Sequence, residues 1–318
     1  MNRILIFCLM SMFCLEAFSQ GCSDAVFCTM GAMRPDQHYD KKIRLKLRSI
    51  EYNFYRGKTN LTPVVTAHTI EANFSINDNN FVHVKLPYQR IEGNFGTSSG
   101  LGDISLSVTR KITNFLDGEI NATAGMKIPT GNGALEDSLG RDWPMYHQPS
   151  LGTYDIILGA SFINRKWLVA TGIQIPLNRN ENQFRYDEWI SNENPDWNYP
   201  GGVEYVLRYD IATYLRRGTD VMLRVERNFR FVNWNVSLGL LPIYRINRDE
   251  IFNISTGERE KLDNTRGLAA SALLGIGYQI NVSHGLKFIY GQKLTDRPVN
   301  PDGLTRENVL SISYIYRF

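Results

Sequence analysis

The segment Gly96-Thr97-Ser98-Ser99-Gly100 has the spelling of the nucleophile elbow that carries the catalytic serine of many hydrolases. That motif needs a strand before the serine and a helix after it, so that the hydroxyl sits on a strained turn. Here the five residues are expected in a Gly/Ser loop that leads into a strand, so we interpret the match as coincidental. His68 and His83 fall on adjacent predicted strands, which keeps a hydrolase as a minor alternative.

Two of the four cysteines, Cys8 and Cys14, lie in residues 1–19, which have the features of a cleaved secretory signal peptide. Arg3 gives a basic start, and the apolar run over 4–15 is shorter than the roughly 20 residues of a transmembrane helix. Removing this segment leaves Cys22 and Cys28 in an oxidising compartment. A disulfide that closes a small loop is therefore expected.

Two other roles for this pair stay open. Cys22 could carry a lipid, although Ser19-Gln20-Gly21 lacks the leucine that a lipoprotein signal usually has. With Met30 and Met33, the cysteines could bind Cu(I), which sulfur ligands suit. Two methionines without a third strong ligand are more often packing residues, so we predict no metal and no cofactor.

The remainder, residues 40–318, consists of segments in which apolar and polar residues alternate. Successive side chains of a strand point to opposite faces, so each segment has one apolar and one polar face. Examples cover residues 64–76, 82–88, 104–109, 120–128, 154–162, 167–175, 203–211, 234–240, 268–280 and 286–290. Mean hydropathy is negative and no second long apolar run exists, which excludes a helix-spanning membrane protein. A β-barrel hides its membrane face by this alternation.

The C-terminal segment has the same alternation with aromatic residues. Leu310, Ile312, Tyr314, Tyr316 and Phe318 share one face, while Ser311, Ser313 and Arg317 fill most of the other, with Ile315 as the exception. The segment resembles the last strand of bacterial outer-membrane barrels, which ends in an aromatic residue. That resemblance implies an insertion signal of Tyr314, Tyr316 and Phe318, read by the barrel-assembly machinery, and outer-membrane lipids as surroundings. An edge strand of a soluble sandwich gives no reason for the terminal Phe318.

Charged residues occupy the polar faces of several segments. They are Lys127, Asp155, Glu204, Arg208, Arg224, Glu226 and Lys287. An Arg or Lys that faced lipid near the midplane would cost about 2–4 kcal/mol, so we place all seven in the lumen. There they either pair to fill the interior or contact a solute directly.

The connections alternate in length. Residues 77–80, 164–166, 216–219 and 281–285 are predicted as tight turns, and 130–150, 178–200, 247–266 and 295–306 as long outer loops. This reading gives 13 segments, whereas a single-chain barrel needs an even number. We attribute the odd number to residues 221–266. Either residues 221–246 form one long bulged strand, which gives 12 strands, or a weak strand lies around 243–254, which gives 14. The lower number is slightly favoured.

Two short motifs carry a more specific resemblance. Gly100-Leu101-Gly102-Asp103 opens one predicted strand, and Lys127-Ile128-Pro129-Thr130-Gly131 closes a later one. Together they resemble the outer-membrane family named after the meta-pathway of phenol degradation, grouped with FadL-like transporters. Glycines let the chain bend at the rim, Asp103 points inward, and Pro129 can end a strand because it lacks an amide donor.

The resemblance implies passage of small aromatic or aliphatic molecules through a narrow barrel with an internal plug. Residues 20–39, an N-terminal periplasmic or luminal segment, could narrow the lumen but hardly fill it. We therefore predict an all-β, transmembrane antiparallel up-and-down β-barrel of the bacterial outer membrane, with 12 to 14 strands and a short N-terminal plug-like segment. It would admit a small hydrophobic solute without enzymatic chemistry. The alternative is a closed structural or adhesive barrel whose loops bind an extracellular partner. A net charge of +3 gives no indication of nucleic-acid binding.

Overall fold

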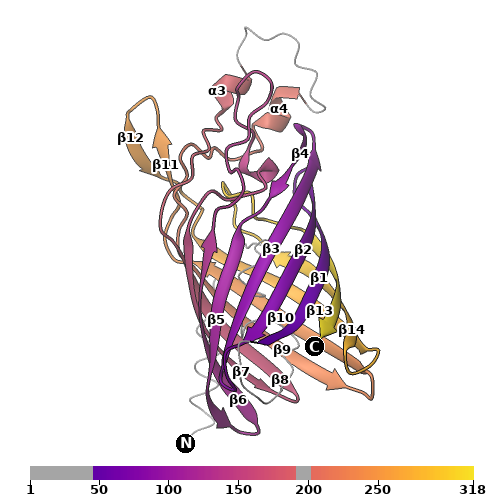
Figure 1. Ribbon diagram of the computed structural model, residues 1–318. Helices are drawn as coiled ribbons and strands as arrows, with labels where there is room; N and C mark the ends of the chain where they lie inside the picture. Colours follow the sequence, from indigo (N-terminus) through magenta and orange to yellow (C-terminus); the bar gives the residue numbers. More distant parts are fainter. Residues whose placement is uncertain (1–45, 191–201) are drawn as a thin grey trace, which may run out of the picture.

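The computed structural model describes residues 46–190 and 202–318, which fold as an all-β barrel (Figure 1). The wall consists of β1 (Lys46–Lys58), β2 (Val64–Ser75), β3 (Asn80–Gly93), β4 (Gly96–Leu101), β5 (Ile104–Phe115), β6 (Gly118–Ile128), β7 (Asp155–Asn164), β8 (Trp167–Pro176), β9 (Asp220–Arg230), β10 (Trp234–Arg245), β13 (Gly267–Gln279), β14 (His284–Thr295) and β15 (Asn308–Arg317). Three short helices, η2 (Met145–His147), α3 (Tyr186–Trp189) and α4 (Gly202–Val206), lie in the loops.

The sheet closes on itself because β1 pairs with β15 on one side and with β2 on the other, and β2 pairs in turn with β3. Every neighbouring pair in the wall is antiparallel. Strands β4 and β5 both pair with β3 and are separated only by residues 102–103, so they form one interrupted crossing. The wall therefore crosses twelve times, which confirms the all-β barrel and the lower predicted strand number.

Alternation along each strand gives the barrel an apolar outside and a largely polar inside. On β6, Met126 is exposed on the outer surface, whereas Asn121, Thr123 and Lys127 are buried in the interior. Aromatic residues on the outer surface include Tyr52, Tyr88, Tyr154, Trp167, Trp234, Tyr244, Tyr290 and Tyr314. An apolar band with aromatic residues is what a lipid bilayer requires of a barrel wall. The protein is accordingly a barrel of the bacterial outer membrane.

The two ends of the barrel differ. Loops 129–154, 177–219, 246–266 and 296–307 lie at one end, and the short turns 76–79, 116–117, 165–166, 231–233 and 280–283 lie at the other, together with Phe318 (Figure 1). This matches the arrangement of long outer loops and short periplasmic turns. Residues 216–219, predicted as a tight periplasmic turn, instead end the second long loop.

The predicted strand over residues 203–211 is wrong. Its first part forms α4, and the chain then turns within loop 177–219, where Tyr205 and Tyr209 are buried. The alternation of apolar residues suited a strand, but the same tyrosines are also four residues apart and share one side of a helical turn. Packing against other loop aromatics decides between the two. Glu204 and Arg208 are therefore exposed loop residues, and their assignment to the lumen is incorrect.

The uncertain stretch 221–266 also differs from both alternatives. Strands β9 and β10 are two crossings joined by the turn 231–233, so no single bulged strand exists there. A hairpin of β11 (Glu250–Asn253) and β12 (Glu258–Lys261) lies outside the barrel sheet, so the alternative of 14 is excluded as well. The turn escaped prediction because it begins with Phe231 and Val232 rather than with the Gly or Pro that mark most turns.

The predicted signal peptide, the Cys22–Cys28 disulfide and the plug-like segment 20–39 lie outside the described residues and stay predictions. Across residues 46–190 and 202–318, no helix is long and apolar enough to cross a membrane.

Candidate functional site in the barrel lumen

The two motifs singled out in the sequence meet in the structure. Asp103 and Lys127 form a buried ion pair, with Nζ and Oδ2 3.1 Å apart. The hydroxyl of Thr130 donates to the carbonyl of Gly102 at 2.8 Å and accepts from the backbone N–H of Ile104. The ends of β4, β5 and β6 are thereby joined into one unit at the outer rim.

Gly131 completes this unit by its lack of a side chain. A Cβ at this position would lie 1.8 Å from the carbonyl oxygen of Leu101, so only glycine allows the two backbones to approach. Pro129 and Gly131 are at the start of loop 129–154, directly after β6 ends at Ile128, and the loop turns inward from this point.

Loop 129–154 narrows the lumen from the outer side. Ser150 donates its hydroxyl to Asp103, whose other carboxylate oxygen accepts the backbone N–H of Leu151 at 3.2 Å. The side-chain amide of Gln89 on β3 donates to the carbonyl of Pro149 at 3.0 Å. Inward folding of this outer loop gives the barrel an internal constriction.

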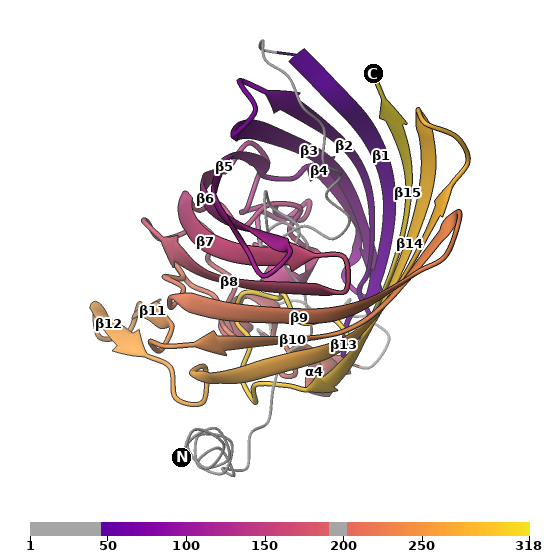
Figure 2. The same ribbon diagram turned by 90° about the horizontal axis from the view of Figure 1, so that it is seen from below.

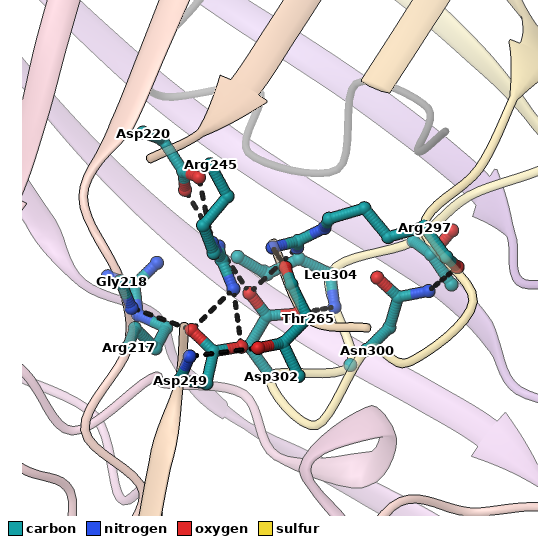
Figure 3. A network of polar contacts seen from close by, with 12 residues as sticks. Arg217, Gly218, Asp220, Arg245, Asp249, Thr265, Arg297, Asn300, Asp302 and Leu304 are labelled. Carbon is teal, nitrogen blue, oxygen red and sulfur yellow. Dashed lines mark hydrogen bonds and ion pairs between the residues drawn. The ribbon is translucent and has the colours of Figure 1, made fainter. Parts of the chain in front are cut away.

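Loop 296–307 is the second inward-folded segment, and Arg245 anchors it. This guanidinium, only 1% exposed, contacts Asp220 and Asp302 at 2.7 and 2.8 Å and Asp249 at 2.8 Å (Figure 3). Arg297 adds a contact to Asp302 at 3.6 Å. Burial by itself would raise the pKa of Asp302, but Arg245 and Arg297 hold that pKa well below its usual range, so the carboxylate stays ionised.

The same network reaches the neighbouring loop. Asp249 accepts the backbone N–H of Gly218 at 2.6 Å, and its own N–H donates to the hydroxyl of Thr265 (Figure 3). Arg217 forms a buried ion pair with Asp155 at the start of β7. Four carboxylates and three guanidinium groups thus fasten three outer loops to the barrel mouth.

An aromatic cluster covers the mouth above these ion pairs. It contains Phe95, Tyr146, Phe184, Trp189, Tyr205 and Tyr209, with Val206. The rings of Phe95 and Trp189 meet edge to face with centroids 4.8 Å apart, a favoured aromatic geometry. His147 packs edge-on against Phe95 and Trp143, and burial lowers its pKa to about 3, so the imidazole is neutral.

The interior has two unlike sides, and Figure 2 shows β2 and β3 across the barrel from β9 and β10. The side formed by β1–β6 carries charged pairs, including Glu71 with Lys85 at 3.8 Å and with His83 at 3.1 Å. The other side carries an apolar cluster, which we call the apolar wall: Ile157, Leu168, Ala170, Met222, Leu241 and Leu273.

Between the two sides lies a cavity of about 140 Å³. Its floor and walls include Leu241, Leu273 and Ile289 from the barrel, and its outer boundary includes Leu151 and Leu304 from the two inward-folded loops. The cavity has room for a small solute within the lumen. We call it the chamber.

The remaining predicted luminal residues lie in the interior. Lys127, Arg224 and Lys287 line the chamber, while Asp155 and Glu226 are buried in ion pairs with Arg217 and Arg224. Sequence reasoning missed Arg245, Asp302 and Arg306. A usable signal existed for Arg245, since it alternates with the lipid-facing Tyr244 and so must point inward.

The residues considered for hydrolysis do not come together. Gly96–Leu101 is strand β4 rather than a loop, no helix follows it, and the Ser98 hydroxyl donates to the backbone carbonyl of His147. His68 lies on the outer surface, where its Nδ1 contacts Tyr52 Oη at 2.6 Å, whereas His83 points into the lumen. Within the described ranges, no group of three or more His, Cys, Asp or Glu side chains could hold a metal.

Comparison with known proteins relates the chain to solved barrels. No model of a known protein family matches the sequence, and no curated protein matches it. The fold is similar to that of the COG4313 outer-membrane channel from Pseudomonas putida F1, with a TM-score of 0.58 and 13% identity over 89% of this chain and 99% of that chain.

Weaker likenesses are to the NanC porin (TM-score 0.47, 8% identity, 86% of this chain and 100% of that chain) and the CymD monoaromatic hydrocarbon channel (0.40, 9%, 96% and 95%). The likeness to the COG4313 channel, at 13% identity, concerns the fold, which is that of an outer-membrane channel barrel.

Proposed function

We propose that the protein is an outer-membrane channel that admits a small, mainly apolar solute by way of the chamber. The observation that supports this most directly is the chamber itself. It combines an apolar wall with a charged side beneath two loops that narrow the outer mouth. Binding sites for small molecules are commonly apolar hollows with a few placed polar groups.

The rim unit supports a resemblance to the phenol meta-pathway and FadL-like barrels, because the two motifs behind it form one structure through Asp103 and Lys127. Single-ring aromatic compounds are therefore the first solutes to test. A cavity of about 150 Å³ accommodates benzene. The chamber, at about 140 Å³, is of similar volume.

Uptake into liposomes tests the proposal. Liposomes that contain the purified protein should take up aromatic or short aliphatic probes faster than empty liposomes. Leu241→Trp, which places an indole in the chamber, should slow uptake, whereas Leu240→Trp on the adjacent lipid-facing position should not. Uptake equal to that of empty liposomes, or equal slowing by both variants, would contradict the proposal.

A closed barrel is the second candidate, and the Arg245 network favours it because this network fastens the loops across the mouth. In that case the long loops would bind a partner outside the cell. Single-channel recording separates the two candidates, since a closed barrel gives no open events.

A further inference from the structure

We infer that the chamber binds a small organic anion, with its carboxylate on Arg306 and its apolar body against Leu241 and Leu273. The inference deepens the proposed function and rests on it, because it names the class of solute that the channel admits. Arg306 belongs to loop 296–307, two residues before β15 begins at Asn308, and its side chain lines the chamber.

The hydrogen bonds of Arg306 leave part of its guanidinium unused. Nη1 donates to the carbonyls of Gly303 and Thr305 at 2.7 and 2.9 Å. Nε is buried and has no hydrogen-bond partner, and Arg306 makes no ion pair with any residue of the described chain. Carbonyl dipoles orient a guanidinium but do not neutralise it. The residue is only 7% exposed, so solvent compensates little of its charge.

Three other cations around the chamber each have a carboxylate partner. Lys127 has Asp103 at 3.1 Å, Lys85 has Glu71 at 3.8 Å, and Arg224 has Glu226. Buried charges in proteins are paired because an uncompensated one costs several kcal/mol. A buried arginine to which residues 46–190 and 202–318 supply no carboxylate, on the wall of a cavity, is therefore a candidate site for a bound anion.

The geometry of the guanidinium and the size of the chamber limit the class of anion. A planar fork of N–H donors suits the two oxygens of a carboxylate. Leu241, Leu273 and Ile289 give the body of the solute an apolar surface, and about 140 Å³ leaves room for one ring or a short branched chain. A cation would add to the charge of Arg306, and a neutral solute would leave that charge unpaired.

Calorimetric titration of the purified barrel in detergent tests this, with benzoate, benzyl alcohol and benzylammonium as probes of one shape and three charges. Benzoate should bind at least about tenfold more tightly than the other two, as expected for a charge-assisted hydrogen-bonded pair. Arg306→Gln should abolish the preference, and Arg306→Lys should keep part of it, because a lysine retains the charge but not the fork.

Arg90→Gln is the matched control, since Arg90 is an exposed arginine paired with Glu92 at 2.7 Å on the outer surface. It should leave the preference unchanged. If Arg306→Gln does not fold, the three ligands on the wild-type protein and the lysine variant still decide the matter.

Equal affinities for benzoate and benzyl alcohol, or a preference that survives Arg306→Gln, would overturn the inference. Liposome uptake is measured separately. A benzoate preference without uptake would contradict the channel function but support the anion site, and uptake without the preference would do the reverse.

Discussion

Arg245 at the outer end of β10 donates from Nη2 to the carboxylate of Asp302 at 2.8 Å, although the two residues are 57 positions apart in the chain. The contact links the barrel wall to the loop that forms part of the chamber's outer boundary. Both side chains are at most 1% exposed, so the pair is little screened by solvent or salt.

Asp302→Asn should loosen loop 296–307 and raise the open probability of the channel. Removal of one partner from a buried ion pair typically costs about 3–5 kcal/mol, so the melting temperature should fall as well. Asp263→Asn is the control, because its pair with Arg248 at 2.8 Å is exposed and surface pairs contribute little. Bilayer recordings with unchanged open probability in Asp302→Asn would show that this contact does not hold the mouth closed.

Asp103 and Lys127 should be energetically coupled at the rim. Asp103→Asn should destabilise the barrel by about 3 kcal/mol, since it weakens the contacts to Lys127 and to Ser150 of the inward-folded loop. The double variant Asp103→Asn/Lys127→Met should lose less free energy of unfolding than the sum of the losses in the two single variants. Urea unfolding in detergent measures all three variants, and strictly additive losses would argue against coupling.

Gly131→Ala should be far more damaging than Gly100→Ala, although both belong to the rim motifs. The added Cβ at residue 131 meets the carbonyl of Leu101 at 1.8 Å, whereas at residue 100 it lies 3.3 Å from the Pro149 ring. Because of overpacking, we expect Gly131→Ala to lower the free energy of unfolding by about 3 kcal/mol and Gly100→Ala to lower it by less than about 1 kcal/mol. The same unfolding assay compares them, and similar losses would mean that the rim backbone moves apart at little cost.

The outer loops should be more stable at pH 5 than at pH 7.5. The pKa of Asp210 is raised from 3.8 to about 6, mainly by burial. The negative charges of Asp302 and Asp249 also raise this pKa, whereas the backbone N–H of Asn300 and the positive charge of Arg297 lower it. A folded-state pKa above the unfolded value gives stability that is present in full below pH about 4 and is lost as the pH rises through about 6. Burial raises the pKa of Asp142 to about 6 too, with the same sign.

Near-ultraviolet circular dichroism of the aromatic cluster during heating checks this pH dependence. Asp210→Asn with Asp142→Asn should flatten it, because neither amide titrates. Wild-type loops that melt at a higher temperature at pH 7.5 than at pH 5 would contradict the assignment.

The barrel itself follows from local pattern. Strand side chains alternate with period two whatever the distant chain does, so Met126 against Lys127, or Tyr314 against Ser313, already defines an outer and an inner face. The rim motifs were found for a similar reason, since glycine, proline and an inward aspartate impose local backbone requirements. Where local pattern was ambiguous, prediction failed: Tyr205 and Tyr209 suit a strand and a helical turn equally, and Phe231 opens a turn without a turn residue.

The chamber and its closure, by contrast, depend on contacts between distant segments. Arg245 and Asp302 gain their roles only when the sheet closes and the loops fold inward, and Arg306 stands out only because no described carboxylate reaches it. Within the strands that form, the sequence by itself determined which residues face lipid and which face the lumen, because side chains alternate from one residue to the next. The tertiary structure decided which inward charges pair and where space remains, because pairing and space depend on how closed strands and loops of different lengths pack together.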